Sequence, residues 1–516
     1  MTPSPGGTPP SGPVIAVVGA GIAGLAAAWE LVTGQGTSGP APRVHIFEAG
    51  GRVGGRMAAT EFAGRRVDVA ADAFLARRPE ATDLCAELGL TDSLVPVGAS
   101  GASIFARGRL RMMPDGLNLG VPTRWGPMAR SGILTLGESL RVGKDLIVPH
   151  RRSGTAWGDR AVGAIVGERL GRPVVERLVD PLVGGINAGG VDDLSAAAAF
   201  PLLLAAASQP GSLMRRLAHS RSASASTGTE PLPAFFSLAG TTASLPEVLA
   251  DALEARGVTI HTRTAVEAME QTGGPNPAWR LSLGGPSAGS GPGSGSGSGS
   301  GGTPAFDGVV LATPAGRSAL LVLPFAPTAG GLLHSIAYAS VSVITLAVPE
   351  DQISDPMRGT GFLVPRTTIF DRGPALTTGV TFLGKKWPHL ASPGTVLLRA
   401  SVGRFGDERH SELDDDELTS AVAGELNRLL GLRGKPMERL VTRWPKALPQ
   451  FEVGHLLRVR AIEQELDVMG AVALAGASLG GVGIPACIGS GRKAARTVLA
   501  ALAPAPKEGA GTSGPP

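Results

Sequence analysis

The residues best suited to chemistry in this chain are three glycines near its amino-terminal end, spaced for contact with a phosphate group. Gly19, Gly21 and Gly24 follow an apolar run at 14–18 and open a run with helical character. In this spacing, the first glycine permits a tight turn, the second leaves room for a pyrophosphate and the third lets the helix pack on the strand. The free N–H groups and the positive dipole end at the start of the helix attract phosphates. The pattern therefore predicts a dinucleotide-binding site.

A second strand-like run strengthens this prediction. Residues 43–47 end at Glu48 and Ala49, and an acid at the tip of the second strand accepts hydrogen bonds from a ribose hydroxyl. Strand, turn, helix, strand and acid thus occur in the required order. We expect Ile22 and Ala23 at the start of the helix, and Glu48 and Ala49 at the end of the second strand, to contact the dinucleotide.

Composition limits the classes of protein that fit. A chain of 516 residues with 43% hydrophobic residues has room for more than one domain. The pI of about 9.4 suits an anionic ligand, but the chain has no basic tract with interleaved aromatics, so we expect no nucleic-acid partner. Two cysteines are too few for a disulfide framework or a metal cage. No signal peptide is visible, the uncharged stretch 468–491 reads as strand, turn and helix, and a cytoplasmic location is the default expectation.

The residues after Glu48 indicate which dinucleotide is bound. They form a second glycine-rich turn that contains Arg52, Gly54, Gly55 and Arg56. This run resembles the flavoprotein amine oxidase and protoporphyrinogen oxidase superfamily, in which it wraps around FAD. The resemblance implies that FAD is the cofactor, that Arg52 lies beside the pyrophosphate and that the glycines leave room for the flavin.

Three further stretches, at 180–195, 448–455 and 474–492, resemble protoporphyrinogen and coproporphyrinogen oxidases in particular. In the family the first stretch lies under the flavin, and a glycine that matches Gly185 turns its carbonyl to the porphyrinogen. The usual tyrosine of this loop is Asn187 here, and the usual aspartate is Gly190. These two departures make the contacts of the loop less defined than its location.

The carboxy-terminal stretch is the most specific of the three. A strand ends at Gly476, and a helix begins after Val482 and Gly483, near Ile484. The resemblance implies that the start of this helix points at the flavin and stabilises negative charge on the reduced ring. The family's adenine-contacting valine, which acts through its backbone, corresponds to Val266.

The resemblance also implies the domain organisation. We expect an α/β fold with a discontinuous, Rossmann-like FAD-binding domain of the GR2 type, a mixed-sheet substrate domain and a helical subdomain. The expected segments are a tail at 1–12, FAD-domain segments at 13–100, 226–324 and 454–503, a helical subdomain at 101–225, a substrate-binding domain at 325–453 and a tail at 504–516. A Gly/Ser insert at 286–303 interrupts the second FAD segment. Apolar spacing predicts helices at 128–150, 160–178, 245–256 and 414–430 and strands at 258–266, 342–348, 378–382 and 396–402.

Within the family, the stretches around 381–389 and 398–404 resemble the bacterial branch that makes coproporphyrin III. There, an aromatic residue matching Phe382 and an aliphatic residue near Leu363 sandwich a pyrrole ring. Lys385, Lys386 and Arg399 are candidates to meet propionate groups, with a solvated surface charge as the alternative for each.

The implied reaction is the oxidation of coproporphyrinogen III to coproporphyrin III in haem synthesis. Six electrons leave in three rounds, and oxygen takes them up with release of hydrogen peroxide. The histidines are scattered, so we expect no catalytic side chain and no metal ion. Protoporphyrinogen IX as substrate, a flavin amine oxidase, and a flavin-carrying protein without turnover remain alternatives. The sequence leaves three further points open. The protein could make weak peripheral contact with a membrane or contact other haem-synthesis enzymes, and it could be a monomer or a homodimer.

Overall fold

A parallel sheet lies at the centre of one lobe of the molecule. The computed structural model describes residues 12–34, 40–148, 158–225, 233–273, 278–285, 305–371 and 373–503. The sheet order is β12 (Thr259–His261), β2 (Arg43–Phe47), β1 (Val14–Val18), β16 (Gly308–Leu311) and β24 (Val472–Leu474), and every neighbouring pair is parallel. The strands come from three separated parts of the chain, so the predicted discontinuous α/β domain is confirmed. The Gly/Ser insert and both tails lie outside the described residues, except for Gly12 of the first tail.

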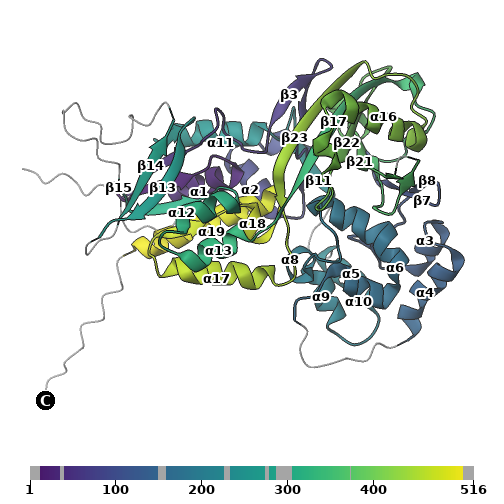
Figure 1. The fold of residues 1–516 in the computed structure, drawn as a ribbon, viewed down its shortest axis with the longest axis horizontal. Coiled ribbons are helices and arrows are strands. Elements are labelled where there is room, and N and C mark those ends of the chain that lie inside the picture. The colour runs from purple at the N-terminus through teal and green to yellow at the C-terminus, as the bar shows by residue number, and fades with distance from the viewer. Residues whose placement is uncertain are drawn as a thin grey trace, which may run out of the picture.

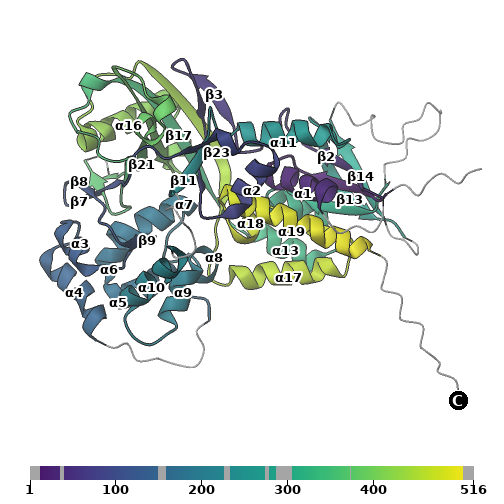
Figure 2. The ribbon, with the colours of Figure 1, turned by 180° about the vertical axis from the view of Figure 1, so that it is seen from behind.

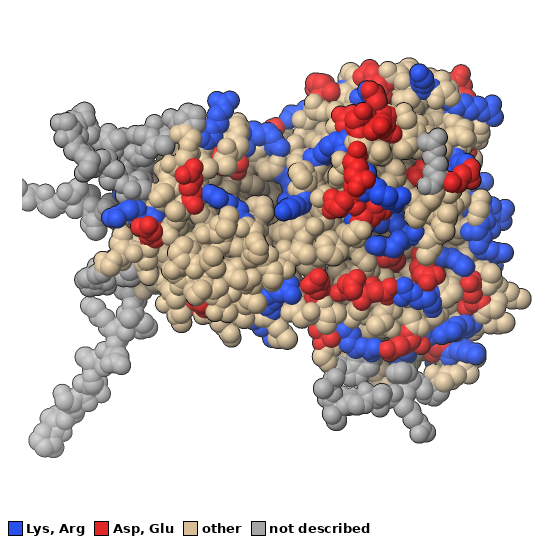
Figure 3. All heavy atoms as spheres, viewed as in Figure 1, with Lys and Arg blue, Asp and Glu red and all other residues tan. Residues whose placement is uncertain are grey.

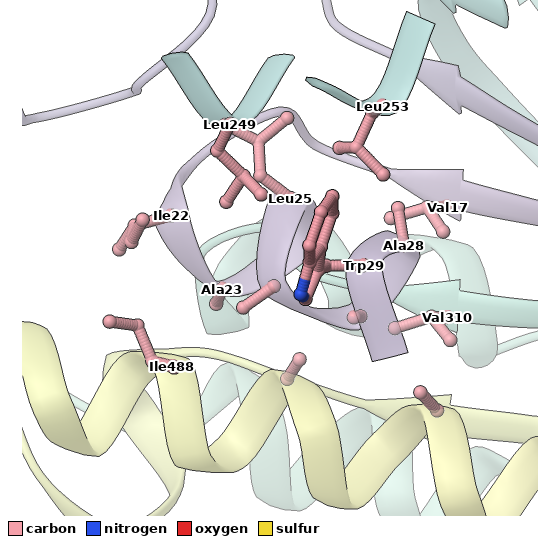
Figure 4. Close-up of a cluster of buried hydrophobic side chains, with 14 of the residues drawn as sticks. Val17, Ile22, Ala23, Leu25, Ala28, Trp29, Leu249, Leu253, Val310 and Ile488 are labelled. Carbon is pink, nitrogen blue, oxygen red and sulfur yellow. The ribbon is translucent and has the colours of Figure 1, made fainter. Parts of the chain in front are cut away.

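Helix α1 (Ile22–Thr33) lies buried between helices from two distant segments (Figure 4). On one side are Leu249 and Leu253 of α11 (Ser244–Glu254), and on the other is Ile488 of α19 (Ile484–Leu502). α1 and α19 approach so closely that a Cβ atom on Gly491 would lie 2.0 Å from the carbonyl oxygen of Ala23. This contact fixes the first half of α19 against the first turns of α1.

The predicted strand at 258–266 is in fact two strands in two sheets. β12 ends at His261, and β13 (Ala265–Gln271) begins a second sheet with β14 (Trp279–Gly284) and β15 (Ala305–Phe306). Between them Arg263 has a φ of +52°, and its N–H donates to the Gly50 carbonyl at 2.8 Å. A tertiary hydrogen bond thus breaks a run that its β-branched residues make look continuous.

The other lobe carries a seven-stranded mixed sheet (Figure 1). Its order is β23 (Glu438–Pro449), β17 (Tyr338–Pro349), β22 (Thr395–Val402), β21 (Thr377–Phe382), β18 (Gly361–Leu363), β7 (Ser103–Ala106) and β8 (Arg109–Met112). Helix α16 (Asp415–Leu430) packs on one face, and its N-terminus has a capping box between Asp414 and Glu417. β7 and β8 lie within the stretch expected to be helical, where their short apolar runs add two strands to this sheet.

The helical lobe lies below this sheet in Figure 1, and Figure 2 shows the same arrangement from behind. The expected helices at 128–150 and 160–178 are each divided, into α3 (Trp125–Arg130) and α4 (Leu136–Ile147), and into α5 (Val162–Leu170), α6 (Arg172–Val174) and the π-helix η2 (Val175–Gly184). They are followed by α7 (Gly185–Asn187), α8 (Ala196–Ala199), α9 (Pro201–Ala207) and α10 (Leu213–Ala225). Among the described helices, none has both the length and the apolar content needed to cross a bilayer.

Shorter elements complete the fold. The further strands are β3 (Ala59–Phe62), β4 (Arg65–Asp68), β5 (Phe74–Leu75), β6 (Leu94–Pro96), β9 (Leu117–Asn118), β10 (Val121–Pro122), β11 (Phe235–Leu238), β19 (Ile369–Phe370) and β20 (Gly373–Pro374). The further helices are α2 (Pro79–Glu87), α12 (Ala315–Val322), α13 (Pro327–His334), α14 (Leu383–Lys386), α15 (Arg409–Glu412), α17 (His455–Asp467) and α18 (Ala477–Gly480). On the face shown in Figure 3, basic side chains are interspersed with acidic ones over the sheet and the helical lobe.

A buried ionic cluster lies between the parallel-sheet lobe and the seven-stranded sheet. Asp72, from the first lobe, lies 2.7 Å from a guanidinium nitrogen of Arg399 and 2.9 Å from Nζ of Lys386, and the indole N–H of Trp387 donates to it at 2.9 Å. Burial raises the pKa of Asp72, but Arg399 and Lys386 outweigh this effect and hold the pKa well below its usual value. Nearby, burial raises the pKa of Asp68 to about 6. The cluster holds the seven-stranded sheet against the parallel-sheet lobe.

The packing of α1 on α19 predicts that Gly491 tolerates no side chain. Gly491→Ala should lower the free energy of unfolding by about 2 kcal/mol or more, because the added methyl group overlaps the Ala23 carbonyl. Gly424→Ala in α16 is the matched control, since a Cβ there meets no atom within 4 Å. That change should be neutral or stabilising by up to about 1 kcal/mol. Urea denaturation measures both, and equal midpoints would contradict the packing described.

The ionic cluster predicts a large effect of removing its acid. Asp72→Asn should cost about 3–5 kcal/mol of unfolding free energy, because two cations stay buried without their partner. Because the folded-state pKa is depressed, this difference should be fully present above about pH 4 and shrink as the pH falls below it. Chemical denaturation at several pH values measures it. Asp371→Asn, which breaks an exposed pair with Arg428, should change stability little at any pH, and a comparable loss there would refute the assignment.

Candidate functional site

The first glycine turn has the geometry that its sequence predicts. Gly19 has a φ of +104°, and a Cβ on it would lie 2.8 Å from the Ala312 carbonyl oxygen, so only glycine fits. Gly21 is the N-cap of α1, no side chain caps the helix, and a Cβ at this position would meet nothing within 4 Å. The helix N-terminus therefore faces open space. Ile22 and Ala23 turn their side chains into the core, so only their backbone is available to a ligand.

Glu48 stands beside this turn as an acceptor. Its carboxylate accepts from the Ala20 N–H at 2.9 Å and from the Gly50 N–H at 2.7 Å. These bonds fix the carboxylate at the end of β2 while leaving further lone pairs for a ribose hydroxyl. Ala49 is exposed next to it.

The second glycine turn packs directly on the first. The Gly54 N–H donates to the Ala20 carbonyl at 2.8 Å, and a Cβ on Gly55 would lie 3.2 Å from the Gly21 Cα. Arg52 folds back on its own turn and donates to the carbonyls of Val53 at 3.0 Å and Gly55 at 2.7 Å. In this structure Arg52 thus stabilises the second glycine turn through hydrogen bonds to its backbone.

The carboxy-terminal turn reaches the same place. α19 begins after Gly483 with no side-chain cap, and Gly476 has a φ of +123° with no atom within 4 Å of a Cβ. Ile484 packs in the same core as Ile22, and Val482 packs against the core of the helical lobe. Arg56, from the second glycine turn, donates to the Lys446 carbonyl at 3.0 Å and lies within electrostatic reach of Cys487. The carboxy-terminal turn therefore lies close to the other two, and we call the open space at Gly21 and Gly476 the flavin crevice.

This crevice fits the FAD that the motifs imply. Two uncapped helix N-termini supply free N–H groups, and the glycines leave space where a side chain would intrude. Val266 is 3% exposed, and its carbonyl accepts from Arg317 at 2.5 Å. Its carbonyl is thus already engaged by a protein donor.

A cleft lies between the segment η2–α7 and the seven-stranded sheet. It has about 550 Å³ of empty space, open solvent included. Gly185 lines it, and a Cβ there would meet no atom within 4 Å. Asn187, which stands where the family's tyrosine is expected, is buried. Its side-chain amide donates to the Val183 carbonyl at 2.9 Å, and its backbone carbonyl accepts from the Gln450 side chain at 2.9 Å. The lining also includes Asp180, Pro181, Val341, Val343, Arg366, Thr378, Ser401, Arg404 and Leu448.

The expected pair Phe382 and Leu363 does not sandwich a ring in this structure. Gly361 pairs with Thr381 and Leu363 with Gly379 across β18 and β21, so Leu363 and Phe382 lie on opposite faces of the sheet. Phe382 is 2% exposed and packs under α16, with its ring centroid 5.9 Å from that of Phe362. Leu363 packs against the helical lobe, on the face that borders the cleft.

The three expected propionate-binding cations have partners within the protein. Lys386 and Arg399 belong to the Asp72 cluster, and Nζ of Lys385 donates to the Met357 carbonyl at 2.6 Å. The cations that line the cleft are Arg366 and Arg404 instead. Arg404 ends the stretch 398–404 that resembles the bacterial branch, so a sequence signal for it was present.

No side chain in the cleft is set up as a general base. Asp180 is the single acid among the residues that line it, and it lies 3.6 Å from Arg366 and accepts from the Val191 N–H at 3.3 Å. His455 is fully buried with its ring 4.6 Å from Phe451, and burial lowers its pKa. Within the described part of the chain, no three His, Cys, Asp or Glu side chains are grouped to hold a metal ion.

Comparisons with known proteins agree with this geometry. A sequence model of flavin containing amine oxidoreductases matches residues 22–499. The chain is 34% identical to a coproporphyrinogen III oxidase of Propionibacterium freudenreichii subsp. freudenreichii, over 98% of this chain and 95% of that protein, and 29% identical to one of Bacillus subtilis (strain 168), over 95% and 98%. A crystal structure of a putative protoporphyrinogen oxidase from Exiguobacterium sp. 255-15 superposes with a TM-score of 0.79 at 29% identity, covering 95% of this chain and 99% of that one. With a family match of this extent around a crevice shaped for FAD, the chain belongs to the flavin containing amine oxidoreductase family and uses FAD as its cofactor.

Proposed function

We propose that this enzyme oxidises coproporphyrinogen III to coproporphyrin III, with oxygen as the electron acceptor and hydrogen peroxide as the second product. The observation that carries the proposal is the cleft between Gly185 and the sheet, whose lining combines apolar side chains with two guanidinium groups and one carboxylate. A flat apolar macrocycle with carboxylate arms has matching chemistry. The relatives from Propionibacterium freudenreichii and Bacillus subtilis, which share nearly the full length of the chain, are named coproporphyrinogen III oxidases.

The balance of the reaction is simple. Six electrons and six protons leave the macrocycle, and three oxygen molecules take them up as three molecules of hydrogen peroxide. When bound, FAD supplies a two-electron acceptor, so three rounds complete one product molecule. The chain's task is to hold the two molecules together in a dry site.

Particular residues would hold the cofactor. We propose that the backbones of Gly21, Ile22 and Ala23 meet the pyrophosphate, that Glu48 meets the ribose and that the turn from Gly54 to Arg56 encloses the flavin. Val482, Gly483 and Ile484 would present the N-terminus of α19 to the ring. Electron-rich pyrroles release hydride without a protein base, so the paired state of Asp180 suits this chemistry.

A porphyrinogen with two carboxylates, protoporphyrinogen IX, is the second candidate. The full-length similarity to Protoporphyrinogen oxidase 2 of Arabidopsis thaliana, at 25% identity, favours keeping it. Either reaction fits a cytoplasmic enzyme, which is the location we propose.

The decisive test of the function is turnover of both candidates. Purified FAD-loaded protein should raise porphyrin fluorescence from coproporphyrinogen III at least about tenfold faster than from protoporphyrinogen IX, because four carboxylates engage the cations of the cleft where two engage fewer. Peroxide should accumulate at three molecules per porphyrin. Rates equal to autoxidation with both substrates would refute the proposal.

The ribose role of Glu48 predicts a loss of cofactor affinity. Glu48→Gln should weaken FAD binding roughly tenfold or more, because a charged hydrogen-bond acceptor is removed from the end of β2. Titration of the apoprotein with FAD, followed by flavin fluorescence, measures this. Glu61→Gln, at an exposed position of β3, is the control and should bind FAD as the unaltered chain does. Equal affinities for the two variants would exclude the role.

A further inference from the structure

The two arginines that line the cleft are less engaged by acidic side chains than Lys386 and Arg399, which were expected from the sequence to meet substrate. In the described part of the chain, Arg404 forms no salt bridge, and one of its terminal nitrogens donates to the Val364 carbonyl at 2.8 Å. Arg366 reaches Asp180 at 3.6 Å, a long contact, with 41% of its side chain exposed. Lys386 and Arg399, by contrast, share a buried carboxylate at under 3 Å.

The local charge balance of the cleft is positive. Among the residues that line the cleft, two guanidinium groups stand against the single carboxylate of Asp180, which contacts Arg366. The carboxylates of Asp407 and Glu425 also attract Arg404, and both have other partners. Asp407 binds Arg409 through both oxygens, at 2.8 and 2.6 Å, and Glu425 accepts from the backbone N–H groups of Leu376 and Thr377. Burial, together with repulsion from Arg366, lowers the pKa of Arg404 to about 10. An anion in the cleft would relieve this repulsion.

The absence of a side chain at position 190 contributes to this balance. A Cβ on Gly190 would lie 3.7 Å from a terminal nitrogen of Arg366. The family's usual aspartate at this position would therefore place a carboxylate against Arg366. Asp193 Oδ2 lies 3.6 Å from the same point, but it forms no salt bridge with Arg366 in the described part of the chain. Glycine thus leaves Arg366 less neutralised than the usual aspartate would.

We propose that Arg366 and Arg404 form a carboxylate-binding subsite of the cleft, and that Gly190 keeps this subsite cationic. The subsite takes carboxylate groups on the edge of the macrocycle, and it rests on the proposed function for the identity of that macrocycle. Each guanidinium offers a pair of N–H donors that match the two oxygens of a carboxylate. The role assigns substrate selection by charge to three residues, of which sequence reasoning had singled out Gly190 only as a departure from the family's loop.

Position 190 allows a test in which charge changes and shape does not. Distances of 3.6 and 3.7 Å from a Cβ are ordinary contacts, so Gly190→Asp and Gly190→Asn should both fold. Gly190→Asp should raise KM for coproporphyrinogen III roughly tenfold relative to Gly190→Asn, with kcat changed much less, because only the carboxylate competes for Arg366. Equal KM values in the two variants would overturn the role of Gly190.

The role of Arg404 can be tested independently by measuring ligand binding instead of turnover. Coproporphyrin III and its neutral tetramethyl ester are titrated into FAD-loaded protein, and binding is followed by porphyrin fluorescence anisotropy. Arg404→Gln should weaken binding of the tetra-acid roughly tenfold and leave binding of the ester unchanged, and Arg404→Lys should restore part of the loss. Lys493→Gln, whose ammonium group pairs with Glu463 at the exposed surface of α19, is the cation control and should bind both ligands as the unaltered chain does.

The outcomes separate the two proposals. If the unaltered enzyme oxidises coproporphyrinogen III but Arg404→Gln loses affinity for acid and ester alike, or for neither, the subsite is refuted and the function stands. If the unaltered enzyme oxidises neither porphyrinogen, the function fails. Binding of the tetra-acid that still depends on Arg404 would then keep the carboxylate subsite, for a different anionic ligand.

Discussion

The approach of α1 to α19 is the constraint on which the rest of the site depends. Gly491 and Ala23 meet backbone to backbone, in a contact that leaves no room for a Cβ. Because both helices begin at glycine turns, this packing places two uncapped N-termini in the same part of the molecule. Hundreds of residues separate the turns in sequence, so their meeting is a property of packing rather than of either motif.

The ionic cluster around Asp72 has a complementary role between the lobes. A buried ion pair is costly to desolvate, and its gain in stability over an apolar contact is small. Its geometry is nevertheless specific, because Asp72 receives Lys386, Arg399 and Trp387 together. That specificity sets the position of the seven-stranded sheet relative to the flavin crevice, and therefore the position of the cleft.

Sequence reasoning succeeded where the structural demand is local. The spacing of Gly19, Gly21 and Gly24 fixes a turn, and the acids at the start of α16 fix a helix end, without reference to distant residues. It failed where a distant partner decides. Alternation along β21 places Val380 and Phe382 on one face, but nothing in the strand reveals that α16 covers that face. Lys386 and Arg399 read as free cations because Asp72, their partner, lies more than 300 residues away in the chain.

The cofactor would thus be recognised by backbone groups, and the substrate by charged and apolar side chains. The flavin crevice is built from backbone, namely glycine turns and helix N-termini, so its sequence pattern is strict. The cleft is built from side chains whose charges offset one another. Since opposite charges there lie within a few ångströms of each other, one residue changes the net charge that a ligand meets. A single substitution in the cleft can therefore change how it meets an anionic substrate without disturbing the backbone that holds the cofactor, and position 190, beside Arg366, is such a place in this chain.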